Sequence, residues 1–328
     1  MRSEEFGRLA RLQILNLSVN SLEGKLPSNL SQCSKLMVFD ANSNRISGSL
    51  PTGFGSLFKL AKIILEKNRL SGSIPASLGN ISSLTHLLLT MNSFQGRVLE
   101  DIDRIPNLRQ FSVGSNLLSG TVPDSVYNLS AVDLFSVNND FVGGLPPGLF
   151  TRFPKLEILA AGMNTFTGPI PVSLSNASGL LQADFGYNSF NGPVPRNPGV
   201  LQSLSFLSFA YNQLGSWGEE DDLGFLTDLT NCNSMETLPL GNNRFGGEVP
   251  KSIGNFSSRL KYLNLRVNQI EGTIPREIEN LAGMTEIDLQ QNRFTGEIPS
   301  GIGKLFKLEE LDFSVNTISG RIPDSLEI

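Results

Sequence analysis

The sequence predicts an α/β solenoid of about thirteen repeats, and three periodic features predict it. Leucines recur with the spacing seen in Leu12, Leu15 and Leu17, and an asparagine closes each such segment. Gly follows four places after the asparagine in twelve of the thirteen repeats, and Pro follows seven places after it in eleven. The asparagines are Asn20, Asn44, Asn68, Asn92, Asn116, Asn139, Asn164, Asn188, Asn212, Asn243, Asn268, Asn292 and Asn316.

Each part of the repeat has a physical reason. In the first repeat, Leu15 and Leu17 alternate with polar residues, which predicts a short strand with one buried face. Successive strands would pair in parallel, about 4.8 Å apart, and form a sheet on the concave face. A buried asparagine amide can satisfy backbone groups in the turn that follows. Gly suits a tight bend, and Pro starts the return path on the convex side.

Two repeats depart from this period. The repeat that ends at Asn139 is one residue short, so we expect a local irregularity in the sheet. The repeat at about 213–243 is enlarged and contains four successive acids, Glu219 to Asp222, before an apolar run. Acids before such a run are typical of a helix start, which predicts a longer convex helix with an acidic first turn. An acidic binding patch is the alternative.

Composition narrows the class of protein. The net charge is −5 and the pI about 5.1, which argues against binding to nucleic acid or anionic membranes. No apolar run approaches the roughly 18 residues that span a bilayer, and no signal peptide opens the chain. We interpret residues 1–328 as a single domain that is a piece of a longer repeat array. Cys33 and Cys232 lie eight turns apart, so we expect two free thiols.

Residues for catalysis are sparse. His86 is the one histidine, and a lone histidine without a cysteine partner supplies neither a metal site nor an ordinary nucleophile–base pair. It is predicted to be an exposed polar residue, with a pH-sensitive ligand contact as the alternative. Acids cluster near the C-terminus, but flat strands offer no pocket to raise a carboxyl pKa. We therefore expect no enzyme activity, metal or cofactor.

Six N-x-S/T sequons predict glycosylation, and hence a secreted chain. Five fall in the connections on the convex side, which are exposed, whereas the sixth, Asn16, lies on a strand of the concave face. The six are Asn16, Asn29, Asn80, Asn128, Asn176 and Asn255.

Exposed strand positions vary between repeats, while core positions do not. A fixed scaffold that carries a variable face suits recognition. Aromatic residues and arginine dominate binding hot spots, and acids follow them towards the C-terminus; scattered surface aromatics are the alternative interpretation. The predicted ligand-binding residues are Tyr187, Phe206, Tyr211, Tyr262, Arg266, Glu286, Asp288, Glu310 and Asp312.

The stretch from Leu308 to Pro323 reads L-x-x-L-x-F-x-x-N-x-I-S-G-x-I-P, with Phe313 and Ile318 at two of the leucine positions. It resembles the plant-specific leucine-rich repeat, and the resemblance covers nearly the whole chain. The chain looks most like the ectodomains of plant leucine-rich-repeat receptor-like kinases, especially the subfamily that senses bacterial patterns. The enlarged repeat with F-L-T-D-L-T-N-C, within Trp217 to Met235, resembles an insertion typical of that subfamily.

The resemblance implies a glycosylated, extracellular module of a receptor kinase that acts in plant immunity and is anchored in the plasma membrane. It also implies a peptide or protein ligand on the concave or lateral face, and a co-receptor ectodomain as second partner. The family's cysteine caps, transmembrane helix and kinase domain are absent from these residues. A free apoplastic inhibitor of a pathogen wall-degrading enzyme, similar to polygalacturonase inhibitors, is the alternative. An ice-binding solenoid is a third reading, but it requires a regular exposed face.

Overall fold

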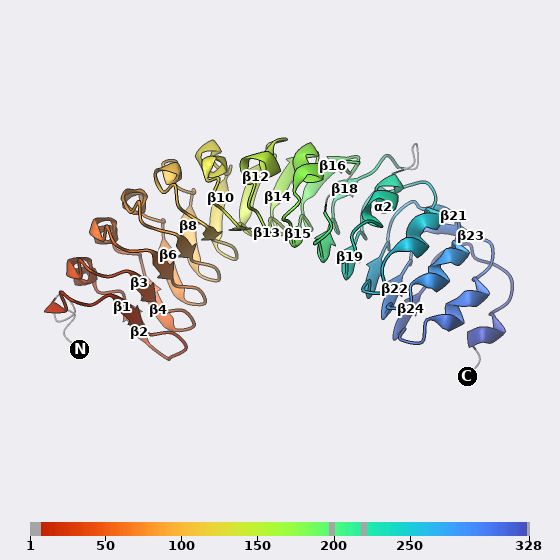
Figure 1. Cartoon of the computed structure of the whole chain (residues 1–328), viewed down its shortest axis with the longest axis horizontal. Coiled ribbons are helices and arrows are strands. Elements are labelled where there is room, and N and C mark those ends of the chain that lie inside the picture. The colour runs from red at the N-terminus through yellow and green to blue at the C-terminus, as the bar shows by residue number, and fades with distance from the viewer. Residues whose placement is uncertain (1–7, 197–200, 218–221, 327–328) are drawn as a thin grey trace. The chain divides into compact units, whose positions relative to one another are not determined.

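The computed structural model describes residues 8–196, 201–217 and 222–326. The chain forms two compact units, Met1–Gly143 with Arg152–Asn164, and Gly144–Thr151 with Thr165–Ile328. In each unit, every repeat contributes a three-residue strand to a parallel sheet, and the chain returns through a short helix on the other side of the turn (Figure 1).

The strands of this main sheet begin where the leucine pattern predicts, and they pair in parallel with the next repeat. In the first unit they are β1 (Ile14–Asn16), β3 (Val38–Asp40), β5 (Lys62–Ile64), β7 (His86–Leu88), β9 (Gln110–Ser112), β11 (Leu134–Ser136) and β13 (Ile158–Ala160). In the second they are β15 (Gln182–Asp184), β17 (Phe206–Ser208), β19 (Thr237–Pro239), β20 (Tyr262–Asn264), β22 (Glu286–Asp288) and β24 (Glu310–Asp312).

A second set of parallel strands follows the asparagines, and the sequence analysis did not predict it. In the first unit these are β2 (Glu23–Lys25), β4 (Arg45–Gly48), β6 (Arg69–Gly72), β8 (Ser93–Gly96), β10 (Leu117–Gly120) and β12 (Asp140–Gly143). In the second they are β14 (Thr165–Gly168), β16 (Ser189–Gly192), β18 (Gln213–Leu214) and the separate pair β21 (Glu271–Thr273) and β23 (Arg293–Thr295). These strands end near the recurrent glycine; Gly48, for example, has φ of +78°, which few other residues adopt without strain.

The return path is mostly 3₁₀ helix, entered from the predicted proline. Pro51 and Pro75, for example, are the N-caps of the helices that follow them. The 3₁₀ helices are η2 (Ser28–Gln32), η3 (Thr52–Ser56), η4 (Ala76–Asn80), η5 (Ile102–Arg104), η6 (Asp124–Asn128), η7 (Val172–Asn176), η9 (Lys251–Asn255), η10 (Arg276–Asn280), η11 (Ser300–Lys304) and η12 (Asp324–Leu326). Two α-helices take the same place in their repeats, α1 (Leu149–Arg152) and α2 (Gly224–Leu229).

The asparagines satisfy backbone groups of two neighbouring repeats, as predicted. Asn68 is typical: its Nδ2 donates to the carbonyls of Ala41 (2.9 Å) and Leu65 (3.1 Å), and its Oδ1 accepts from the Ile46 amide (3.0 Å). The side chain thus joins its own turn to the turn before it, which explains the requirement for an amide at this position.

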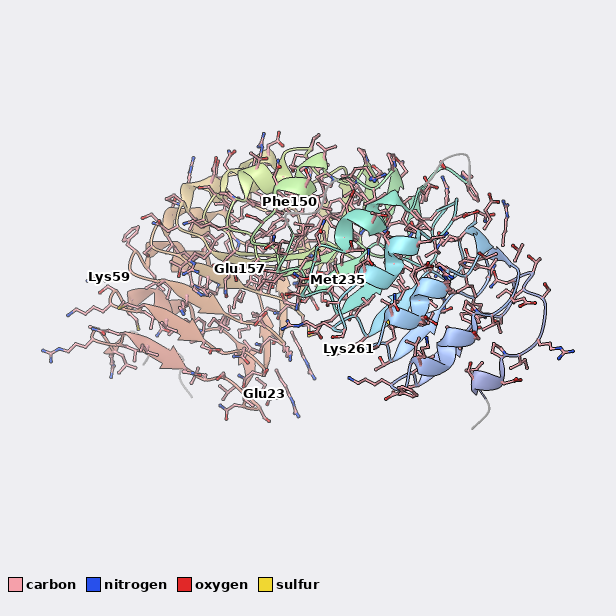
Figure 2. The ribbon with its side chains drawn as sticks, turned by 45° about the vertical axis from the view of Figure 1, so that its right-hand side comes forward. Glu23, Lys59, Phe150, Glu157, Met235 and Lys261 are labelled. Carbon is pink, nitrogen blue, oxygen red and sulfur yellow. The ribbon has the colours of Figure 1, made fainter. Side chains whose placement is uncertain are left out.

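The core is a column of leucine, isoleucine and phenylalanine side chains between strands and return helices. Phe166 and Phe190, each two places after an asparagine, stack with ring centroids 6.0 Å apart. Phe150 and Met235 are buried, whereas charged side chains such as Lys59, Glu23 and Glu157 are exposed at the surface (Figure 2). Cys33 and Cys232 are both buried, and neither forms a disulfide, which confirms the prediction of two thiols. Burial raises the pKa of the Cys232 thiol to about 11.

The short repeat does not disturb the sheet, so the expected irregularity in the sheet was wrong. Strand β11 keeps a three-residue register with both neighbours. The repeat is one residue shorter in the turn that precedes Asn139, not in the strand. In other repeats the residue before the asparagine has a positive φ, as Ser115 and Met163 do, and Asn138 does not. Side-chain bonds compensate, because the Asn116 amide donates to Asn139 Oδ1 (3.0 Å) instead of to a carbonyl.

The enlarged repeat does contain a helix, α2, but its first turn has no acid. Asp222 lies before the N-cap residue Leu223, and its Oδ2 accepts from the Ser216 amide (2.9 Å) and the Gly246 amide (2.8 Å). The carboxylate therefore closes the loop instead of balancing a helix dipole, and the predicted acidic first turn was wrong. The other three acids, Glu219, Glu220 and Asp221, lie outside the described residues.

Candidate functional site

The candidate site lies on the strand face of the second unit, by which we mean the exposed side of β15 to β24 and the turns that follow these strands. Tyr187 and Tyr211 lie in adjacent turns and stack closely, with ring centroids 4.2 Å apart and an angle of 13° between the rings. They are 50% and 38% exposed. Both have φ near +55°, an unfavourable conformation for a bulky residue. The scaffold therefore holds two exposed rings in a fixed, strained position.

Arg266 links this pair to the next repeats. Its Nη2 donates to the Tyr211 hydroxyl over 3.1 Å, although 55 residues separate the two in sequence. Gly241 leaves the space between them, since a Cβ there would lie 2.8 Å from Arg266 Cγ and 2.4 Å from Asn264 Oδ1. Arg266 Nε is buried and has no acceptor among the described residues. The predicted Tyr187, Tyr211 and Arg266 therefore form one assembly.

Tyr262 and Phe206 lie on the same face but are half-buried. The Tyr262 hydroxyl accepts a hydrogen bond from Asn264 Nδ2 (3.0 Å), and burial raises the pKa of Tyr262. Phe206 begins β17, in register with Gln182 and Thr237. Each side chain therefore offers one edge to a ligand instead of a whole ring.

The four predicted acids are paired across β22 and β24, Glu286 with Glu310 and Asp288 with Asp312. Burial, followed by repulsion from Glu310, raises the pKa of Glu286. Burial also raises the pKa of Asp288. The expectation that these strands could not raise a carboxyl pKa was therefore wrong: like charges on adjacent strands and partial burial suffice without a pocket.

Asp288 lies in a buried position, although an exposed one was predicted, and both of its carboxylate oxygens bond within the scaffold. It is 7% exposed. Its Oδ1 accepts from the Gln290 amide (3.0 Å) and its Oδ2 from Asn264 Nδ2 (3.0 Å). Asp312 makes the equivalent bond to the Ser314 amide (2.8 Å), and bonds to Ser314 lower its pKa. An Asp at this strand position caps the turn that follows, and this leaves Glu286 and Glu310 as the freer acids.

The sequence analysis missed a second exposed aromatic site, at Trp217. This residue is 57% exposed with φ of +65°, and the Arg244 guanidinium lies 4.8 Å from its ring centroid. Gly215 before it has φ of +102°, and a Cβ there would lie 2.6 Å from the Arg244 carbonyl oxygen. The only tryptophan of the chain, two places after a displaced glycine, was the available signal.

His86 lies in the first unit, between Lys62 and Gln110 in register. It is half-buried, not exposed as predicted, and its Nδ1 lies 2.8 Å from the Thr85 hydroxyl. Burial first, and then the charge of Lys62, lowers the pKa of His86. The imidazole is thus kept neutral at pH values where a free histidine would begin to take up a proton.

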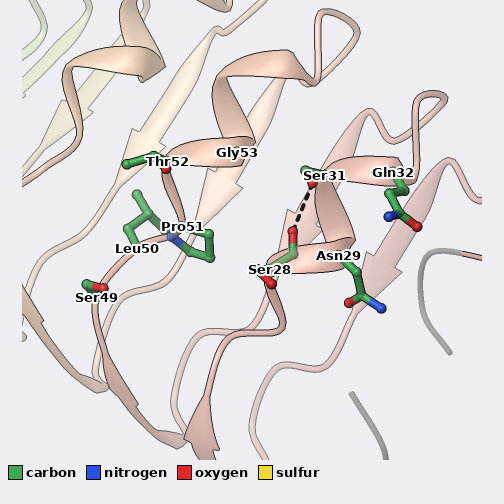
Figure 3. A pocket seen from close by; sticks show the side chains of 9 residues that line it. All are labelled: Ser28, Asn29, Ser31, Gln32, Ser49, Leu50, Pro51, Thr52 and Gly53. Carbon is green, nitrogen blue, oxygen red and sulfur yellow. Dashed lines mark hydrogen bonds between the residues drawn. The ribbon is translucent and has the colours of Figure 1, made fainter. Parts of the chain in front are cut away.

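In the first unit, a pocket lies between η2 and η3 (Figure 3). Its volume is about 510 Å³, and its lining includes Ser28, Asn29, Gln32, Ser49 and Thr52. The lining contains no charged side chain, so it lacks the convergent charged groups of a catalytic site.

The sequons fall into three structural classes. Asn80, Asn128, Asn176 and Asn255 are each the last residue of a 3₁₀ helix and are exposed. Asn29 instead lies inside η2, and both its amide atoms are buried without a partner. Asn16 is exposed on β1, and its Oδ1 accepts from the Ser18 amide (2.9 Å).

We therefore expect glycans on the four helix-end asparagines and not on Asn29, because a glycan needs a free Nδ2. Expression in a secretory host, glycan release in heavy-oxygen water and peptide mass spectrometry would check this. A labelled Asn29 together with four unlabelled helix-end sites would contradict the expectation.

No cluster of three or more His, Cys, Asp or Glu side chains among the described residues could hold a metal ion. No helix in that part of the chain is long and apolar enough to cross a membrane.

Comparison with known proteins defines the class. The Leucine Rich Repeat family model matches residues 11–33, 35–57, 259–281, 283–305 and 307–327. The rice (Oryza sativa subsp. japonica) receptor kinase-like protein Xa21 is 46% identical over 71 residues, 22% of this chain and 7% of Xa21. The Arabidopsis thaliana LRR receptor-like serine/threonine-protein kinase EFR is 44% identical over 78 residues, 24% of this chain and 8% of EFR. These matches therefore span less than a tenth of either relative.

Solved structures of plant receptor kinases match the fold of almost the whole chain. The LRR ectodomain of the plant membrane receptor kinase GASSHO1/SCHENGEN3 from Arabidopsis thaliana has a TM-score of 0.91 and 30% identity, over 98% of this chain and 38% of that one. The Arabidopsis receptor kinase HAESA, in complex with the peptide hormone IDA and the co-receptor SERK1, has a TM-score of 0.60 and 26% identity. The match covers 97% of this chain and 68% of that one. The chain folds as a leucine-rich-repeat solenoid. Its homologues are plant leucine-rich-repeat receptor kinases.

Proposed function

We propose that this chain is the extracellular recognition module of a plant receptor-like kinase, and that it binds an extended peptide or protein segment on the strand face of the second unit. The observation that carries the proposal is the assembly of Tyr187, Tyr211 and Arg266. Rings held rigidly and partly exposed lose little entropy on binding, and tyrosine and arginine are the typical anchors of an interface.

The relatives support this class of function. HAESA binds a peptide hormone together with a co-receptor, and GASSHO1/SCHENGEN3 is a membrane receptor kinase whose solved part is an ectodomain. By analogy we propose a co-receptor ectodomain as a second partner, a role in immunity as a bacterial-pattern receptor, and anchoring of the whole protein in the plasma membrane. We also propose that residues 1–328 act as one domain without catalytic activity or a cofactor.

Charge supports a basic element in the ligand. Glu286 and Glu310 lie side by side at the start of β22 and β24, and the net charge of the chain is −5. A cationic residue placed there would relieve the repulsion between the two glutamates. Binding should therefore weaken as salt is raised, and also as pH falls, since protonation of Glu286 removes charge.

Selection from random-peptide phage libraries against the immobilised chain tests the proposal. We expect peptides that bind saturably and that protect backbone amides of β15 to β24 from hydrogen exchange. Protection confined to the return helices η9 to η11, or no peptide that binds, would overturn the proposed function.

A further inference from the structure

We propose that Arg266 and the Tyr211 hydroxyl form a carboxylate subsite, so that the ligand segment carries an acidic group between an apolar residue and a basic one. This inference rests on the proposed function and specifies the chemistry of the ligand at that site.

The first argument is the set of unused donors on Arg266. A guanidinium has five N–H donors, and the structure shows one of them bonded, to Tyr211. Nε is buried without an acceptor, and Arg266 forms no ion pair with any described carboxylate. Because the buried Nε is out of reach of a ligand on the surface, a ligand carboxylate would bind the N–H donors of Nη1 and Nη2 that Tyr211 does not use.

The second argument concerns the neighbouring acids. Asp288 and Asp312 both interact electrostatically with the charge of Arg266. Each of these carboxylates is nevertheless hydrogen-bonded to its own turn. Asp288 also holds Asn264. These acids are thus bonded within the scaffold, which leaves the Arg266 guanidinium available to a carboxylate of the ligand.

The third argument is the fixed position of the guanidinium. Gly241 lets the Arg266 side chain cross one repeat close to the backbone, and Tyr211 is itself held by its stack on Tyr187. A planar guanidinium held in place can donate two parallel hydrogen bonds to the two oxygens of a carboxylate. A lysine at position 266 could not reproduce that geometry.

The spacing of the strands sets the order of groups in the ligand. An apolar side chain would pack on Tyr187 and Tyr211, the carboxylate would meet Arg266, and a basic residue would reach Glu286 and Glu310. Three strand spacings of about 4.8 Å separate the Tyr211 repeat from the Glu286 repeat, which an extended chain spans in roughly four residues.

Two phage libraries test whether the carboxylate comes from a side chain inside the segment, as the proposed order of groups requires, or from the C-terminus, which would overturn that order. Peptides displayed with a fused C-terminus can offer only side-chain carboxylates, whereas peptides displayed with a free C-terminus also offer the terminal one. Each selected peptide would be synthesised, with the C-terminus free or amidated and with Asp or Glu changed to Asn or Gln. Affinity would be measured for the wild type, Arg266→Gln, Arg266→Lys and the control Arg276→Gln, whose side chain is 87% exposed on η10.

We expect Arg266→Gln to weaken binding about tenfold or more, Arg266→Lys to weaken it less, and Arg276→Gln to leave it unchanged. Neutralising the ligand carboxylate should cost the wild type the same factor and Arg266→Gln almost nothing. Arg266→Lys keeps the test valid if Arg266→Gln unfolds. If peptides bind to the strand face but need no carboxylate, or bind equally to Arg266→Gln, the subsite is overturned while the proposed function stands. If no peptide binds, both are overturned.

Discussion

Replacing Asn164 with alanine is expected to destabilise the chain far more than replacing Asn176. The Asn164 side chain accepts from the amides of Asn139 (3.1 Å) and Phe141 (2.9 Å). It donates to the carbonyls of Val137 (2.9 Å), Ala161 and Gly162 (both 3.1 Å). Alanine removes all five bonds.

The cost follows from burial. Asn164 is 9% exposed, so water cannot readily replace the lost partners. Each buried group left without a partner costs about 1–3 kcal/mol, and the two amides alone predict a loss of several kcal/mol. Since each repeat is stabilised mainly by its neighbours, the loss falls on both adjoining turns.

Asn176→Ala is the matched control, because Asn176 is exposed at the end of η7. Urea unfolding of protein made without glycans, followed by circular dichroism, would compare the two variants. Equal midpoints for the two variants would contradict the scaffold role of the asparagines.

The repeat pattern was sufficient to predict the parallel strands, the asparagine bonds and the bends at glycine. All three depend on contacts between equivalent residues of adjacent repeats, so periodicity alone specifies them. The second set of strands was missed because its segments, such as Arg45 to Gly48, contain a single apolar side chain, which is too few to show an alternating pattern. Their pairing depends on backbone groups brought together by the first sheet.

The site was predictable only in part, for a related reason. The repeat period identifies equivalent exposed positions in adjacent repeats, and it therefore predicted that Tyr187 and Tyr211 are neighbours. Burial of Asp288 could not be read from it, because that burial depends on Asn264 in the adjacent repeat. The link from Arg266 to Tyr211 was equally hidden, since it depends on the absence of a side chain at Gly241, where the Arg266 side chain passes.

Once a peptide ligand is selected, Tyr211→Ala should weaken its binding by about 1–2 kcal/mol, as loss of an interface anchor does. Tyr211 both stacks on Tyr187 and accepts from Arg266, so its loss removes ring area and frees the guanidinium. Tyr262→Ala should have an effect of the same order, as its half-buried ring borders the same face.

A phenylalanine variant separates the two contributions of Tyr211. Tyr211→Phe keeps the ring and loses the hydroxyl, so it should retain most of the packing energy but release Arg266. Lys251→Ala, at the start of η9 on the return side, is the control and should leave affinity unchanged. Titration calorimetry with one selected peptide would rank the four variants. The site assignment fails if Lys251→Ala abolishes binding while the tyrosine variants bind like the wild type.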